Sequence, residues 1–441
     1  MHATTAADAV TAPLSIPSRL DRIPVTRLHA GAVLVCGLGF MFDAMEIALG
    51  SGLGAVFSTP PHVASRSDLA LLLSAVYAGA IPGAPLFGWF ADRYGRRLTM
   101  IVLMWVMALA SAGAAQSHGL HALAAWRCAA GLALGAFPPL MTTYLTDLLP
   151  PARRGLGLLI AIAIGMAGPG AGLLLIRAMT PLQLLGLEGW RWAFIAGTGG
   201  AAAVALLYVL LPESPRWLAA RGRAAEAERD LGRFAASPVV ASAGTPAPPA
   251  PGPVRTRRWS VVAGLYFLSP WSSVAFPVMA GVVLAQKGHG IAETLLYVGL
   301  SSIGPVVGTL AAGFGIDRLD RRLALYVCAA ALCASDLVFL TADSPAWLIL
   351  SSLCFGLFGS LMLSVLNLYG GESFSTAARA RGLAWGWGLN RVGAAAAPFV
   401  LLPLLQLHGP LAMFAVIGGS LLAGVVLLAA GGPAPARRPV A

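Results

Sequence analysis

Long apolar stretches dominate the sequence, and polar residues gather between them. Twelve stretches are long enough to cross the hydrocarbon core of a bilayer as a helix, which takes about 20 residues. They cover residues 30–57, 69–91, 98–116, 121–147, 155–178, 190–211, 259–285, 293–316, 322–341, 344–370, 380–405 and 410–430. Transmembrane β-strands would instead show alternation over segments of about ten residues. The pattern therefore predicts an all-α membrane protein with twelve transmembrane helices.

The composition agrees with this prediction. Of the 441 residues, 58% are hydrophobic and only 11% are charged, whereas about 25% of the residues of a soluble domain are charged. This excludes an ordinary soluble protein and makes the lipid bilayer the expected surroundings of the chain.

The positive charges are distributed unevenly between the two sides of the predicted bundle. Of 29 Lys and Arg residues, 23 lie in the amino-terminal arm, in every second loop and at the carboxyl end. Four lie in the opposite loops and two lie inside spans. Positive loops face the cytoplasm, so we expect a multi-pass inner-membrane protein with both termini cytoplasmic. This placement accounts for the net charge of +11, and no nucleic-acid partner is expected.

One long polar segment divides the chain into two parts. It covers residues 212–258, begins with "PESPRWL", continues with "RGRAAEAERDLGRF" and contains the Pro-rich "TPAPPAPGPV". The middle part predicts a short surface helix, and the Pro-rich part a tether. We therefore expect a six-helix half with its amino-terminal arm (1–211), a cytoplasmic central loop (212–258), and a second six-helix half with a short tail (259–441).

The two halves contain a repeat at one fixed offset. "GWFADRYGRRLTM" (88–100) aligns with "GFGIDRLDRRLAL" (313–325) at a shift of 225 residues, and the same shift aligns "DLLPPARRGLG" (147–157) with "ESFSTAARARG" (372–382). Six spans per repeat give both copies the same orientation in the membrane. Such a parallel repeat has a pseudo-twofold axis along the membrane normal.

These motifs resemble known transporters. "GWFADRYGRR" is similar to the loop signature of the major facilitator superfamily, and "PESPRWL" to its sugar-porter-like branch. "RLDRIPVTRLH" followed by "GLGFMFDAMEIAL" resembles the proton symporters of nicotinate and aromatic acids, although Glu46 stands where that group usually has Asp. The Gln and Asn pairs of sugar carriers are missing from "YFLSPWSSVAFPVMAG". The resemblance implies the fold of that superfamily and an organic acid rather than a hexose as substrate.

The repeated loop charges are expected to act as a cytoplasmic gate. In related carriers such loops hold the cytoplasmic side closed, and the resemblance assigns this role to eight residues. They are Asp92, Arg93, Arg96, Asp147, Arg154, Asp317, Glu372 and Arg379. The alternative is that these charges only anchor the helices at the membrane interface.

Four charges inside the spans have no counterpart in the repeat: Asp43, Glu46, Arg127 and Arg391. A charge at the bilayer centre costs about 2.5–3.5 kcal/mol, so each must face water, pair or be neutralised. Asp43 and Glu46 are three residues apart on one helix face, and two acids in a low dielectric favour proton uptake. We predict that they couple transport to protons, with Asp43 favoured. The alternative is that they are structural partners of the two arginines.

The predicted substrate site centres on Arg391, because a fixed positive charge beside an aromatic ring suits an aromatic carboxylate. A salt bridge from Arg391 to one of the two acids is the structural alternative. Arg127, near the outer end of its span, is expected to extend toward the periplasm. The other candidate substrate-binding residues are Asn390, Trp387, Trp271, Phe355 and Phe358.

No metal or cofactor is expected. The five cysteines lie inside apolar spans without metal-ligand spacing, and no nucleophile–base pair or phosphate loop is evident. The chain is therefore not expected to be an enzyme.

The sequence predicts a monomeric carrier that imports a small organic anion, such as nicotinate or a hydroxybenzoate, together with protons. Two alternatives remain: a proton-driven exporter of drugs or metabolites, and a non-transporting membrane receptor that uses the same fold.

Overall fold

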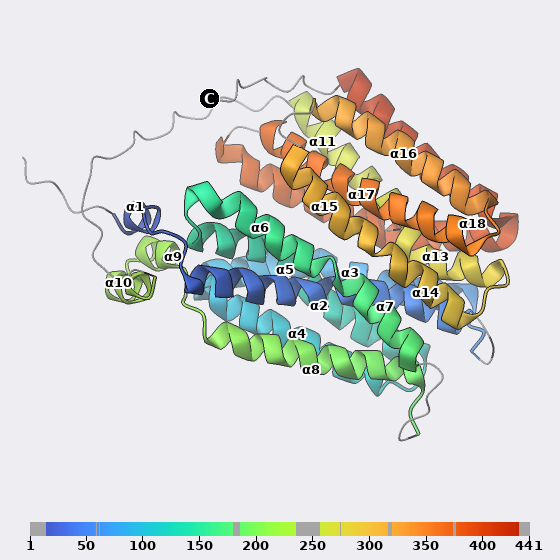
Figure 1. Cartoon of the computed structure of the whole chain (residues 1–441), viewed down its shortest axis with the longest axis horizontal. Helices are drawn as coiled ribbons and strands as arrows, with labels where there is room; N and C mark the ends of the chain where they lie inside the picture. Colours follow the sequence, from blue (N-terminus) through green and yellow to red (C-terminus); the bar gives the residue numbers. More distant parts are fainter. Residues whose placement is uncertain are drawn as a thin grey trace, which may run out of the picture.

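The computed structural model describes residues 15–58, 60, 62–179, 186–234, 256–273, 275–315, 320–373 and 376–431 (Figure 1). The amino-terminal half contains α2 (Arg27–Phe57), α3 (Arg66–Tyr94), α4 (Arg96–Ala115), α5 (Leu120–Leu148), α6 (Pro151–Gly165), α7 (Gly168–Met179) and α8 (Gly189–Val209). The carboxyl-terminal half contains α11 (Thr256–Leu268), α12 (Pro270–Ser273), α13 (Ala275–Gln286), α14 (Ile291–Ser301), α15 (Ile303–Gly315), α16 (Arg321–Thr341), α17 (Pro345–Ser373) and α18 (Thr376–Gly431).

Twelve spans are recovered from these helices. Ten helical segments of the described chain are long and apolar enough to cross a membrane. The predicted seventh span contains α11, α12 and α13, each of which is too short to be counted alone. α11 ends at Leu268 and α12 begins at Pro270, whereas residue 274 lies outside the described residues. One counted segment lies within α18, where Gly409 has a φ of 81° and separates two helices. Together with the split seventh span, this division gives the predicted twelve-helix architecture.

The helix bounds follow the 225-residue repeat in four helices of each half. α3 begins at Arg66 and α14 at Ile291, α4 at Arg96 and α16 at Arg321, and α6 at Pro151 and α18 at Thr376. α5 and α17 coincide at both ends after the shift. The repeat therefore relates α4 to α16 and α5 to α17 residue by residue.

Three short helices lie together at one end of the bundle, which we call the basic end. They are α1 (Ile16–Leu20), α9 (Pro215–Ala220) and α10 (Ala224–Gly232), and α1 contacts both others (Figure 1). Ion pairs of 2.5 Å join Arg19 to Glu228 and Arg216 to Asp21. The predicted surface helix of the central segment is thus present and is attached to the amino-terminal half.

The two halves pack against each other through α2 with α13, α7 with α14, α3 with α18 and α6 with α15. At the far end, opposite the basic end, glycines allow the backbones to approach closely. A Cβ at Gly281 of α13 would lie 2.7 Å from the carbonyl oxygen of Ser51 in α2. A Cβ at Gly170 of α7 would lie 3.2 Å from the carbonyl oxygen of Gly299 in α14.

The side chain of Lys287 caps the carboxyl-terminal end of α16. Its ammonium group donates to the carbonyl oxygens of Phe339, Leu340 and Ala342 at 2.8–2.9 Å. A cation at this position favours the helix because the last carbonyls carry partial negative charge. Partial burial lowers the pKa of Lys287, and the nearby Asp343 opposes that shift.

Candidate functional site

A buried ion pair joins α2 to α5 in the amino-terminal half. The Arg127 Nη1 donates to Glu46 Oε2 and to the Glu46 carbonyl oxygen, both at 2.7 Å. Ser111 of α4 donates to the other carboxylate oxygen of Glu46. The Arg127 and Glu46 side chains are 1% and 3% exposed. Each charge is therefore balanced inside a single half.

The position of Arg127 differs from the sequence expectation. Its side chain does not extend to the outer surface, because Glu46 holds it in the interior and the ring of Phe194 lies 6.0 Å from its guanidinium carbon. Gly50, one turn beyond Glu46, leaves room for the guanidinium, since a Cβ there would lie 3.2 Å from Nη2. The prediction that Arg127 extends toward the periplasm is wrong.

Asp43 and Arg391 form a second pair of opposite charges, across the boundary between the halves. Asp43 lies on α2 and Arg391 on α18, and the two interact electrostatically. Within the described residues neither forms an ion pair within 4.0 Å, and Asp43 Oδ1 is buried without a hydrogen-bond partner. Asp43 is 1% exposed and Arg391 8%. Unlike Glu46 and Arg127, these two charged side chains interact electrostatically but do not form a hydrogen-bonded ion pair with each other.

Tyr77 of α3 lies between the two charge pairs and was not predicted from the sequence. It interacts electrostatically with both Arg391 and Arg127, and its buried hydroxyl has no hydrogen-bond partner in the described structure. A tyrosine inside an apolar span gives no signal of its own, because its role depends on which helix packs beside it. The contact of α3 with α18 supplies that neighbour.

The residues around Arg391 are partly fixed by the carboxyl-terminal half. The Arg391 guanidinium carbon lies 5.4 Å from the ring centre of Trp387, as the sequence suggested. The Asn390 amide donates to Ser269 Oγ at 2.9 Å and to the Tyr266 carbonyl oxygen at 3.3 Å. Asn390 thus joins α18 to α11, and its direct contact with a substrate stays a prediction.

The other predicted aromatic residues differ in their surroundings. Phe355 is 1% exposed and stacks on Phe276 with 4.0 Å between ring centres, so it belongs to a packed aromatic cluster. Phe358 is half-buried against the core. Trp271 packs on Phe267, and its buried indole N–H has no partner in the described structure. Trp271 therefore keeps a free donor for a ligand, whereas Phe355 is enclosed by other rings.

Some of the predicted gate residues that are described contact one another, and the others contact further residues of the amino-terminal half. Arg96 pairs with Asp92 at 2.8 Å and lies 4.0 Å from Asp147, while Arg154 lies 3.6 Å from Asp21. The Arg93 guanidinium carbon lies 5.8 Å from the ring centre of Tyr94. Asp317 and the side chains of Glu372 and Arg379 lie outside the described residues. The gating role of all eight residues stays a prediction.

Glu213, which the sequence reasoning did not single out, holds the start of α4 at the basic end. Its carboxylate accepts hydrogen bonds from the backbone amides of Arg96 and Arg97 at 2.9–3.1 Å and from that of Ser214 at 2.9 Å. Burial raises the pKa of the Glu213 carboxyl, and these amides counteract the rise. Position 95 has to be glycine, because its φ is 113° and a Cβ there would collide with the carboxylate of Glu213.

Replacing Glu213 by alanine should destabilise the protein by about 2 kcal/mol, because three donors lose a charged acceptor. Thermal unfolding of the purified protein in detergent measures the effect. Glu213→Gln should lose less, since the amide oxygen still accepts. Glu226→Ala, which removes an exposed acid of α10, serves as the control and should cause no measurable change. If Glu213→Ala unfolds like that control, the capping role is wrong.

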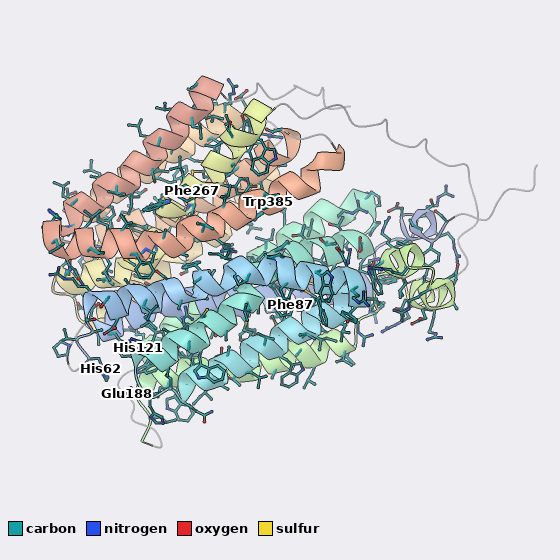
Figure 2. All side chains as sticks on the ribbon, turned by 180° about the vertical axis from the view of Figure 1, so that it is seen from behind. His62, Phe87, His121, Glu188, Phe267 and Trp385 are labelled. Atoms are coloured by element: carbon teal, nitrogen blue, oxygen red, sulfur yellow. The ribbon has the colours of Figure 1, made fainter. Side chains whose placement is uncertain are left out.

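A separate cavity of about 810 Å³ lies at the far end of the amino-terminal half, and none of the predicted site residues lines it. Its lining includes His62 and Glu188, which are paired at 2.7 Å, together with His118 and Arg191. Figure 2 shows His62, His121 and Glu188 near one another at this end. In the described residues no group of three or more His, Cys, Asp or Glu side chains is arranged to hold a metal ion.

The chain is similar to known proteins both in sequence and in fold. The family model described as Major Facilitator Superfamily matches residues 28–398. The niacin transporter NiaP of Acinetobacter baylyi is 25% identical over 411 residues, covering 90% of this chain and 91% of the relative. The gallate transporter of Pseudomonas putida is 28% identical over 443 residues, covering 97% of each. A partially occluded inward-open structure of the xylose transporter XylE from E. coli has a TM-score of 0.74 at 18% identity, covering 94% of this chain and 100% of the other.

Proposed function

Because the chain belongs to the major facilitator superfamily, we propose that it imports a small aromatic monocarboxylate together with protons. Membership of this family and the apolar helices make it a multi-pass membrane transporter rather than an enzyme. Two similar proteins are named as niacin and gallate transporters. Both of those substrates carry a carboxylate on an aromatic ring, which matches the chemistry around Arg391.

The observation that carries the proposal is the difference between the two charge pairs. Glu46 and Arg127 are joined by hydrogen bonds inside one half, so movement of the halves leaves them together. Asp43 and Arg391 belong to opposite halves and are held by no hydrogen bond to each other. A substrate carboxylate can therefore bind Arg391 when Asp43 takes up a proton and loses its charge.

The transport cycle follows from this exchange. Asp43 binds a proton from the outer side, which frees the charge of Arg391 for the substrate carboxylate. The aromatic ring of the substrate packs beside Trp387, and Tyr77 and Trp271 offer an O–H and an N–H donor. Rocking of the halves then opens the basic end, which we assign to the cytoplasm together with both termini. The protein acts as a monomer in the inner membrane.

Arg391→Lys tests the substrate site. We expect nicotinate to bind about 10- to 100-fold more weakly, because lysine cannot reproduce the bidentate contact of a guanidinium with a carboxylate. Binding of nicotinamide, the matched neutral amide, should change by less than about threefold. Calorimetry or thermal shift on the purified protein measures both. An equal loss for the two ligands would assign Arg391 a structural role instead.

A further inference from the structure

Asp336 is a buried acid that the proposed transport cycle does not use. It lies on α16 in the carboxyl-terminal half, 4% exposed, and both carboxyl oxygens are buried without a hydrogen-bond partner in the described structure. The sequence analysis passed over it, although it stands within an apolar span like the four other charges. Intramembrane acids are expensive to keep and usually serve a function.

The buried face of α16 places Asp336 toward other helices. Leu325, Cys328, Leu332 and Phe339 lie on the same buried stripe at helical spacing. One turn beyond Asp336, Phe339 packs against Phe276 of α13 and Phe414 of α18. The carboxyl group therefore lies inside the carboxyl-terminal half, beneath a cluster of aromatic rings.

The internal repeat provides a second observation about position 336, because the equivalent position of the other half can be compared with it. Shifted by 225 residues, Asp336 corresponds to Ser111 and Ser352 corresponds to Arg127. In the amino-terminal half, Ser111 and Arg127 both contact Glu46 and so border one buried charged pocket. At the equivalent positions, the other half has an acid where the first has a serine, and a serine where the first has the arginine.

No described neighbour supplies the missing positive charge. Among the side chains that the structure describes, the titratable or positive ones on the elements around α16 are Cys354 and Tyr369 on α17, Arg391 and His408 on α18, and Lys287 after α13. Cys333 of the same helix interacts electrostatically with Asp336, and within the described residues no cation lies within ion-pair distance of Asp336. Lys287 instead binds the carbonyl oxygens at the end of α16. A buried ionised carboxylate without a hydrogen-bond donor or a cation is strongly disfavoured.

We propose that Asp336 is a second proton-binding site, which is protonated in this conformation and exchanges its proton with water during transport. This inference rests on the proposed proton-coupled uptake. In the cycle, a proton from outside forms an O–H bond on the Asp336 carboxylate, and that bond breaks to release the proton inside. With Asp43 the carrier then moves two protons with each monoanion, so one net positive charge enters per cycle.

The test measures charge movement in proteoliposomes that contain the wild-type protein, Asp336→Asn or Asp343→Asn, an exposed acid nearby as control. With a pH gradient held constant, an inside-negative potential of about 59 mV should raise nicotinate accumulation about tenfold in the wild type and the control. Asp336→Asn should still respond to the pH gradient but not to the potential. Wild-type uptake that ignores the potential, or an Asp336→Asn variant that responds fully, overturns the inference.

Infrared spectroscopy of the purified protein provides a second test that does not depend on nicotinate. The carbonyl stretch of a protonated carboxyl group should be present in the wild type, and part of it should be missing from Asp336→Asn. An unchanged band overturns the inference even if this variant transports poorly. If the wild type accumulates no nicotinate in a pH gradient, the proposed function fails instead, and the infrared result still decides whether Asp336 is protonated.

Discussion

Asp43→Asn is expected to lower the accumulation of nicotinate about tenfold in a gradient of one pH unit while leaving its exchange across the membrane intact. Asparagine has the shape of aspartic acid but cannot bind and release a proton. A gradient of one pH unit is worth about 1.4 kcal/mol per proton, which sustains about tenfold accumulation for each coupled proton. In the variant, the ratio of internal to external nicotinate should fall about tenfold in this gradient, because only the proton on Asp336 stays coupled. Uptake into proteoliposomes with an imposed pH gradient measures the loss.

The exchange measurement separates a coupling defect from a folding defect. Vesicles loaded with unlabelled nicotinate should still take up labelled nicotinate through Asp43→Asn, because Arg391 remains available. Glu293→Gln, which changes an exposed acid of α14, is the control and should accumulate nicotinate like the wild type. If both Asp43→Asn and Glu46→Gln accumulate nicotinate normally, proton coupling does not reside in the first span.

Arg127→Met should destabilise the protein by about 3–5 kcal/mol, because it leaves the carboxylate of Glu46 buried without its cation. The structure provides no second positive group for Glu46 within hydrogen-bond distance in its described part. Thermal unfolding in detergent should show the loss as a large fall in the apparent midpoint.

The double variant Glu46→Met/Arg127→Met tests the pair as a unit. Replacing both charges by apolar side chains of similar length should recover most of the lost stability, since neither charge is left alone. Gradient-driven uptake by the double variant then decides the role of Glu46. Normal uptake makes the pair structural, and uncoupled uptake places Glu46 in the proton pathway beside Asp43. A double variant as unstable as Arg127→Met would contradict the pairing itself.

The sequence was sufficient for the architecture because hydropathy directly reflects the lipid surroundings. The predicted spans match the helices within a few residues, and the 225-residue shift matches the bounds of α5 and α17 at both ends. The division of the seventh span was not predicted, although Pro270 marks the start of α12. Proline cannot donate the backbone hydrogen bond that would continue α11. However, prolines also lie inside the unbroken helices α3 and α5, so a proline alone does not locate the break.

The sequence identified most charged residues of the candidate site, but it did not show which acid interacts with which arginine. An unrepeated charge in an apolar span is visible in the sequence, and this criterion found Asp43, Glu46 and Arg391. Which acid meets which arginine depends on the packing of α2 against α5 and of α3 against α18, which no local pattern contains. Applied consistently, the same criterion would also have found Asp336. Tyr77 required the structure, because only its neighbours give it a role.

The glycine contacts at the far end bear on how fast the carrier can change state. At Gly281 and Gly170 the facing atoms are backbone oxygens and the small side chains of Ser51, Ala55 and Ser302. A side chain at Gly281 would force the facing backbone of α2 to shift. We therefore expect larger residues at this position to slow the opening of the far end.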